Sequence, residues 1–153
     1  MTDVALTARL DPAWNSAQVD LASASEMDLR YRSLLGDVEL RIGDSDFSTK
    51  WGWIPLLDFA LGLTDLLMRL PDSRFESFEF TESGAELRFE MRDREVEIRS
   101  NFTAAIGHAP LDVLRRAALG LAEQVLSAAR TEAPGIDANP DFERLVRGIR
   151  RSV

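Results

Sequence analysis

Hydrophobic and polar side chains alternate in several short segments near the start of the chain, which is the period-two pattern of half-buried β-strands. The first segment, residues 4–10, ends at Asp11-Pro12. Residues 27–31 and 38–42 show the same alternation on either side of Leu35-Gly36-Asp37. The pattern predicts one strand followed by a β-hairpin.

Three more alternating segments, residues 78–80, 87–91 and 96–98, follow later in the chain. With Ser83-Gly84 as a two-residue turn, Phe80 would lie opposite Leu87, and Phe78 opposite Phe89. This register predicts a three-stranded meander with one apolar face. The opposite face would be charged and open to water, as is common for an antiparallel sheet covered on one side only. It would carry Glu86, Arg88, Glu90, Glu95, Glu97 and Arg99.

Helical periodicity occupies the remaining apolar segments. Residues 56–70 predict a long helix that begins after Pro55 and ends at Pro71-Asp72. A second amphipathic helix is expected after Pro110, with its apolar stripe running from residue 111 to residue 128. Asn139-Pro140 has the pattern of an N-cap and first helical residue, so a short terminal helix is expected to follow it.

The predicted order is three strands, one helix, three strands and two helices. It indicates an α+β fold in which an antiparallel sheet of about six strands carries its helices on one face. A single domain is expected to cover residues 1–153. Residues 38–41 (VELR) and 60–63 (ALGL) recur at one common offset as residues 96–99 (VEIR) and 118–121 (ALGL). A duplicated unit of three strands and a helix is therefore one hypothesis, while chance similarity of such short segments is the other.

Composition narrows the function classes. The 153 residues include 26 acidic and 18 basic side chains, which gives a formal net charge of −8. This charge disfavours nucleic acid as a partner and favours a basic protein partner. The first ten residues lack a basic signal-peptide start, and residues 54–70 contain three charged side chains, so no membrane association and a cytoplasmic location are expected.

The chain contains no cysteine and one histidine, which excludes disulfides, thiol catalysis and thiolate or multi-histidine metal sites. Nucleotide-binding glycine loops and the serine nucleophile elbow are also missing from the sequence. We therefore expect no cofactor and no metal. Enzyme activity stays open but is the less favoured alternative.

The main candidate binding residues lie in one short segment, where an acidic loop with Asp44 and Asp46 leads into Trp51-Gly52-Trp53. Tryptophan is a frequent anchor of protein interfaces, and glycine permits close approach of a partner. Acidic side chains would steer a basic partner toward such an anchor. The sequence therefore predicts a partner-binding site at Asp44, Asp46, Trp51 and Trp53, although tryptophans of this kind also serve hydrophobic cores.

An alternative site would be a small-molecule pocket or minor active site between the long helix and the sheet. Asp58 and Asp65 share one stripe of the helix, about 10 Å apart along its axis, and His108 lies at a helix entrance. The same residues also fit ordinary roles, because Asp65 and Arg69 have the spacing of a helical ion pair. A homo-oligomeric structural subunit is a third alternative.

The chain also resembles a group of small, acidic bacterial proteins of the immunity-protein type found in toxin systems. The resemblance covers about residues 27–146 and lies in WIPLLDFALGLTDLLMRL, FEFTESGAELRFEMRDREVEIRSNF, PLDVLRRAALGLAEQVL and NPDFERLV. These motifs are structural, so no functional residue is carried over from them. The resemblance implies a non-enzymatic binding module, of immunity or regulatory type.

Overall fold

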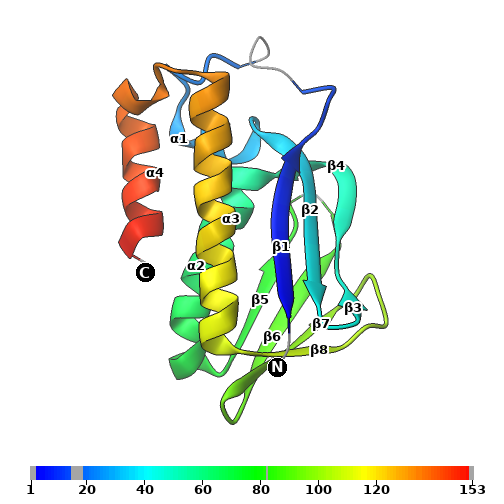
Figure 1. Ribbon diagram of the computed structural model, residues 1–153. Coiled ribbons are helices and arrows are strands. Elements are labelled where there is room, and N and C mark those ends of the chain that lie inside the picture. The colour runs from blue at the N-terminus through cyan, green and yellow to red at the C-terminus, as the bar shows by residue number, and fades with distance from the viewer. Residues whose placement is uncertain (1–2, 15–18, 82, 152–153) are drawn as a thin grey trace.

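Helices gather on one side of the molecule and strands on the other (Figure 1). The computed structural model describes residues 3–14, 19–81 and 83–151. The strands are β1 (Val4–Leu10), β2 (Leu35–Ile42), β3 (Ser45–Asp46), β4 (Thr49–Pro55), β5 (Phe75–Glu79), β6 (Glu86–Arg92), β7 (Glu95–Ser100) and β8 (Gly107–Pro110). The helices are α1 (Glu26–Tyr31), α2 (Leu56–Ser73), α3 (Leu111–Glu132), the 3₁₀ helix η1 (Ile136–Ala138) and α4 (Pro140–Arg151).

The strands in the described part of the chain form two four-stranded antiparallel sheets. In the first sheet β2 pairs with β1, β3 and β4, whereas the second sheet has the order β5-β6-β7-β8. The sheets approach one another where Ser45 Oγ donates to the Ile106 carbonyl at 2.7 Å and Gly107 packs against Ile42 and Phe47. The predicted α+β antiparallel class is therefore confirmed, with the strands divided between two sheets.

One predicted strand is a helix. Residues 26–31 form α1, where the Ser25 side chain caps the N-terminus by accepting the Asp28 N–H at 3.2 Å. Of the three alternating apolar residues only Leu29 is buried, whereas Met27 and Tyr31 are exposed. The prediction of a hairpin between 27–31 and 38–42 is therefore wrong, and β2 pairs with β1 instead.

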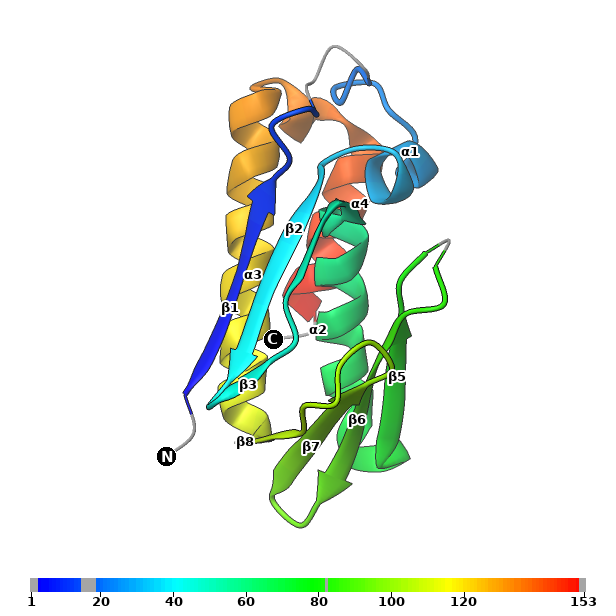
Figure 2. The same ribbon diagram turned by 90° about the vertical axis from the view of Figure 1, so that its right-hand side faces the viewer.

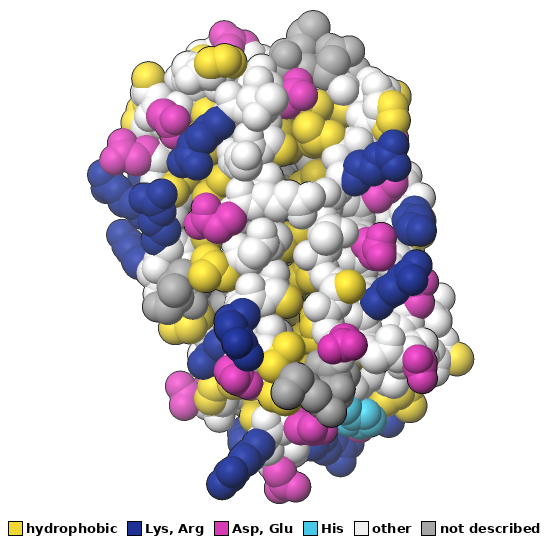
Figure 3. Space-filling model, viewed as in Figure 1, with side chains coloured by type: hydrophobic (Ala, Val, Ile, Leu, Met, Phe, Trp, Pro, Cys, Tyr) yellow, Lys and Arg dark blue, Asp and Glu magenta, His cyan; other side chains and the backbone are white. Residues whose placement is uncertain are grey.

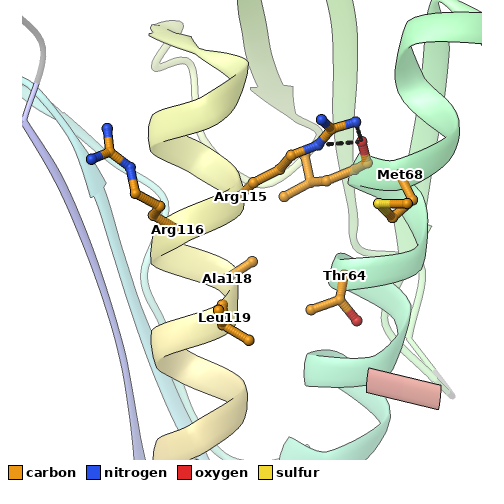
Figure 4. Close-up of a pocket in the computed structure, with 7 residues that line it drawn as sticks. Thr64, Met68, Arg115, Arg116, Ala118 and Leu119 are labelled. Carbon is orange, nitrogen blue, oxygen red and sulfur yellow. Dashed lines mark hydrogen bonds between the residues drawn. The ribbon is translucent and has the colours of Figure 1, made fainter. Parts of the chain in front are cut away.

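The long helix is confirmed, although it continues past its expected end. Helix α2 begins at Leu56 and ends at Ser73, with Pro71 in its last turn. Proline has no N–H to donate to the carbonyl four residues earlier, that of Leu67. Arg115 of α3 supplies the missing donors, since its Nε and Nη2 lie 3.3 Å and 3.0 Å from that oxygen (Figure 4). The end of α2 is thus fastened to α3.

The two later helices begin as predicted. Helix α3 follows Pro110, and at the start of α4 the Asn139 side chain accepts the Asp141 N–H at 2.9 Å. The Asn139 amide also donates to the carbonyls of Leu21 and Ala24, each at 2.9 Å, which joins α4 to the segment before α1. Among the helices that the structure describes, none combines the length and the apolarity needed to cross a membrane.

The predicted meander exists, but its register differs. Phe78 lies opposite Leu87, and Phe89 lies opposite Glu76, a shift of two residues from the expected pairing. The cause is a longer turn than Ser83-Gly84 alone, because the Phe80 N–H bonds the Ala85 carbonyl at 2.9 Å. An even shift keeps every side chain on its face. The apolar face packs on α2, where Phe78 contacts Gly62, and the opposite face is charged as predicted.

The two halves of the chain contain the same kind of junction between a strand and a helix. Strand β4 ends at Pro55 and continues directly into α2, and β8 ends at Pro110 and continues directly into α3. The two prolines take extended backbone angles at the N-cap position of these helices. This shared junction is compatible with a duplicated unit, which stays a hypothesis.

Candidate functional site

Strand β4 is interrupted by a wide bulge at Trp51-Gly52-Trp53. In the pairing with β2, Gly36 lies opposite Ile54 and Val38 lies opposite Thr49. The single residue Asp37 of β2 is therefore matched by residues 50–53 of β4. Gly52 has φ of +79°, a conformation that glycine adopts without strain. Its N–H donates to the Asp37 carboxylate at 2.7 Å. Bulges of this kind redirect side chains next to binding sites, and this one displays two tryptophans.

The two tryptophan rings form the outer end of an aromatic stack. Trp51 and Trp53 lie 5.3 Å apart between ring centroids at an interplanar angle of 21°. Trp51 meets Phe80 and Phe102 edge-on at 5.5 Å and 5.3 Å, and Phe80 stacks on Phe59 at 5.8 Å. Trp51 is therefore partly a support for the core, whereas Trp53 is the outermost ring.

Helix α1 brings two further exposed side chains to this place. Met27 and Tyr31 are 62% and 40% exposed, and Trp51 and Trp53 are 36% and 39% exposed. Met27, Tyr31 and Trp53 line a surface hollow of about 540 Å³ together with Arg32, Leu35, Pro55 and Thr81. We call Met27, Tyr31, Trp51 and Trp53 the aromatic surface.

The aromatic surface has the composition of an interface anchor. Tryptophan, tyrosine and methionine are enriched in protein–protein interfaces, and exposed apolar residues that gather in one place mark binding sites. Charged side chains of both signs surround the aromatic surface, since Arg32 pairs with Asp28 at 3.5 Å. On the face that carries α3, α4 and β1, basic and acidic side chains are interspersed as well (Figure 3).

The structure separates the predicted acidic residues from the tryptophans. Asp44 and Asp46 are exposed around the β2–β3 turn. Asp46 lies opposite Arg41, three residues along β2 from the Val38–Thr49 pair, which corresponds to about 10 Å of strand. Hydrogen bonds from the side chain and backbone of Ser48 lower the pKa of Asp46. The two aspartates therefore lie at the β2–β3 end of the same sheet and do not belong to the aromatic surface.

The three residues of the alternative pocket lie apart. Asp58 is buried at the start of α2 and accepts from Arg30 Nε and Nη2 at 3.0 Å and 2.6 Å. Burial is the largest single influence on Arg30 and opposes its charge, but the hydrogen bond with Asp58 and the attraction of Asp58, Tyr31 and Glu26 together outweigh it and raise the pKa of the guanidinium. Asp65 is exposed further along α2. His108 lies on the outer face of the second sheet, away from α2.

The interface between α2 and the sheet is packed rather than hollow. Phe59 of α2 meets Phe78 edge-on at 5.0 Å, and the Phe78 ring lies so close to Gly62 that an added Cβ would come within 2.6 Å of it. The geometry brings Asp58, Asp65 and His108 to no common site. Within the described ranges, no group of three or more acidic or histidine side chains could hold a metal ion.

His108 instead belongs to a cluster around Glu97, the one residue of the charged face that is buried. The Glu97 carboxylate accepts from Arg99 Nε at 2.7 Å and lies 3.3 Å from His108 Nε2 and 3.7 Å from Arg92. The hydrogen bond from Arg99, assisted by His108, lowers the pKa of Glu97. The cluster therefore holds Glu97 in its charged form.

This cluster predicts a loss of stability in acid. Because the pKa of Glu97 is lower in the folded chain than its usual value of about 4.3, its contribution is fully present above that pH and is lost as the pH falls through the folded value. Urea titrations between about pH 6 and pH 3 should show the free energy of unfolding falling, with a shallower fall in Glu97→Gln. Glu76→Gln is the comparison variant, because hydrogen bonds from Ser73 and Arg69 lower the pKa of Glu76 as well. An unchanged slope in both Gln variants would contradict this account.

Met27 and Tyr31 are the members of the aromatic surface that the sequence did not reveal. The signal was Ser25 with Asp28 three residues later, an N-capping pattern that shows residues 27–31 to be helical and places positions 27 and 31 on one helix face.

Comparison of the chain with models of known protein families, with curated proteins and with solved structures gave no match.

Proposed function

We propose that this chain is a protein-binding module of immunity or regulatory type that engages a basic protein partner through the aromatic surface. The observation that carries the proposal is the stacked pair Trp51–Trp53, displayed on a bulge beside exposed Met27 and Tyr31. A bulge fixed by the Asp37–Gly52 hydrogen bond holds the rings in place before a partner arrives. Less conformational entropy is then lost on binding.

Charge supports the choice of a basic partner. The formal net charge is −8, and exposed Asp44 and Asp46 lie further along the same sheet. Long-range attraction raises the rate of association and is screened by salt, whereas a desolvated aromatic ring acts mainly once contact is made. The two sets of residues therefore have separable roles, the aspartates in steering and the tryptophans in holding.

Truncation of the outermost ring tests the holding role. Trp53→Ala is expected to raise the dissociation rate of the captured partner about 30-fold or more, the usual effect of an interface hot spot. The partner is captured from native lysate with the unaltered chain and its kinetics are measured by surface plasmon resonance. Met68→Ala is the matched control, because Met68 is 41% exposed but lies on α2 beside Thr64 and Arg115, outside the aromatic surface. Equal effects of the two variants would refute the aromatic surface as the anchor.

The steering role is measured in the same experiment. Reversal of charge at Asp44 and Asp46 should slow association and leave dissociation nearly unchanged, and raising the salt concentration should do the same to the unaltered chain. An association rate that is independent of both would remove the basic partner from the proposal.

A small molecule is the second candidate occupant, because the hollow of about 540 Å³ beside Trp53 lies in the size range of ligand sites. If a metabolite co-purifies with the chain, is lost in Trp53→Ala, and no protein is captured, the hollow is a ligand site and the protein-binding proposal fails.

A further inference from the structure

The free edge of β5 exposes unpaired backbone groups in a regular array. The Met91 N–H bonds the Arg74 carbonyl at 2.9 Å, and the Phe80 N–H bonds the Ala85 carbonyl at 2.9 Å. In an antiparallel pair, bonding toward the neighbouring strand alternates from residue to residue. Even-numbered residues of β5 therefore bond β6, and the N–H and C=O groups of Phe75, Ser77 and Glu79 point away from the sheet. These three residues are exposed.

The other sheet edges in the described part of the chain are closed in different ways. At β1 the Gln124 side chain of α3 bonds both backbone groups of Ala8, accepting its N–H at 3.0 Å and donating to its carbonyl at 2.7 Å. Strand β4 is broken by its bulge, and the short β8 lies against the end of β2 near Gly107. Strand β5 keeps a regular register through all five of its residues.

The open edge and the aromatic surface meet at one rim of the molecule. Figure 2 shows β5 as the outermost strand of its sheet, with the β5–β6 loop rising toward α1. Thr81 of this loop lines the same hollow as Tyr31 and Trp53. A segment laid along β5 and continued past Glu79 would therefore arrive at the hollow.

We propose that β5 binds an extended, basic segment of the partner protein as an added fifth strand of this sheet. The five residues of β5 offer about 17 Å of edge, enough for a strand of similar length. Charge selects the occupant, since the exposed charged residue of β5 is Glu79, whereas Glu76 pairs with Arg69 of α2 at 2.9 Å. A second copy of the chain would bring the same two glutamates and a net charge of −8. The identity of the occupant, a basic protein, rests on the proposed function.

A proline at the centre of the edge tests the backbone bonding. Ser77→Pro removes an outward N–H without removing a bond to β6, and Ser77→Ala keeps that N–H. The probes are a fluorescent ten-residue peptide that alternates lysine with valine and a twin with glutamate in place of lysine. Fluorescence polarisation should show binding of the lysine peptide to the unaltered chain and to Ser77→Ala, about tenfold weaker binding to Ser77→Pro, and little binding of the twin. Equal binding of the two peptides, or no effect of Ser77→Pro, would overturn the proposal.

Nuclear magnetic resonance of the unaltered, ¹⁵N-labelled chain gives the answer even where Ser77→Pro does not fold. With the lysine peptide, the amide protons of Phe75, Ser77 and Glu79 should exchange more slowly and move downfield, while those of Glu76 and Phe78, already bonded to β6, change little. Changes centred on other strands would refute the edge. Sedimentation of the chain alone as a dimer that Ser77→Pro dissociates would also refute it, because the occupant would be a second copy.

The two proposals fail separately. A captured partner that depends on Trp53 but is insensitive to Ser77→Pro leaves the proposed function standing and removes the added strand. Binding of the lysine peptide at β5 with no partner captured from lysate removes the proposed function and leaves the edge as a site for basic extended segments.

Discussion

Replacing Phe89 with alanine is expected to lower the free energy of unfolding by about 3–5 kcal/mol, the usual cost of the cavity left by a large core side chain. Phe89 is 2% exposed and lies on β6, inside the second sheet, opposite Ile98 and Glu76. Neighbouring strands on both sides restrict collapse around the cavity. Urea denaturation followed by circular dichroism measures the loss.

The adjacent residue supplies the control. Arg88 points to the outer face, where its side chain pairs with Glu86 and is about half exposed. Because exposed ion pairs contribute little, Arg88→Ala should cost at most about 1 kcal/mol. Similar losses in the two variants would mean that the faces of this sheet are assigned wrongly.

Gly36→Ala is expected to cost about 3 kcal/mol or more, at the upper end of the range for overpacking. Gly36 lies in β2 between Leu10 of β1 and Ile54 of β4. A Cβ atom there would come within 2.0 Å of the Arg9 carbonyl oxygen, which is backbone and cannot rotate away. Thermal and urea denaturation of the variant measure the loss, and a stability within about 1 kcal/mol of the unaltered chain would contradict this close approach.

A second glycine makes the comparison specific. Gly120 lies in α3, and a Cβ atom added there would meet nothing within 4 Å. Alanine stabilises a helix interior by roughly 0.5–1 kcal/mol relative to glycine. Gly120→Ala should therefore raise the free energy of unfolding, opposite in sign to Gly36→Ala.

The parts of the fold that the sequence predicts are those with long, unbroken periodicity. Residues 4–10 and 86–100 alternate cleanly and form strands, and the apolar stripes after Pro55 and Pro110 form α2 and α3. Strand β4 was missed because its bulge interrupts the alternation at Gly52, and β8 has only four residues. Residues 27–31 alternate like a strand but form a helix, because the Ser25 side chain caps the helix and Leu29 is its only buried residue.

The candidate site was only half visible in the sequence. The Trp51-Gly52-Trp53 segment stood out because tryptophan is rare and glycine separates the pair. Its neighbours came from α1, which is distant in sequence, and no local pattern reports that Met27 and Tyr31 line the same hollow as Trp53. Asp58 and Asp65 lie on α2 and His108 lies on β8, and the three side chains face different surroundings, which are set by tertiary packing.

The contact between Arg115 and the Leu67 carbonyl links two positions that no sequence pattern connects. While residue 71 is proline, the carbonyl depends on a donor from the other half of the chain, and loss of the guanidinium would strand a polar group inside the protein. A residue with an N–H at position 71 would restore the helical hydrogen bond to the Leu67 carbonyl. Residue 115 would then no longer need to supply a donor. The two positions are thus epistatic, and what evolution can accept at either depends on what occupies the other.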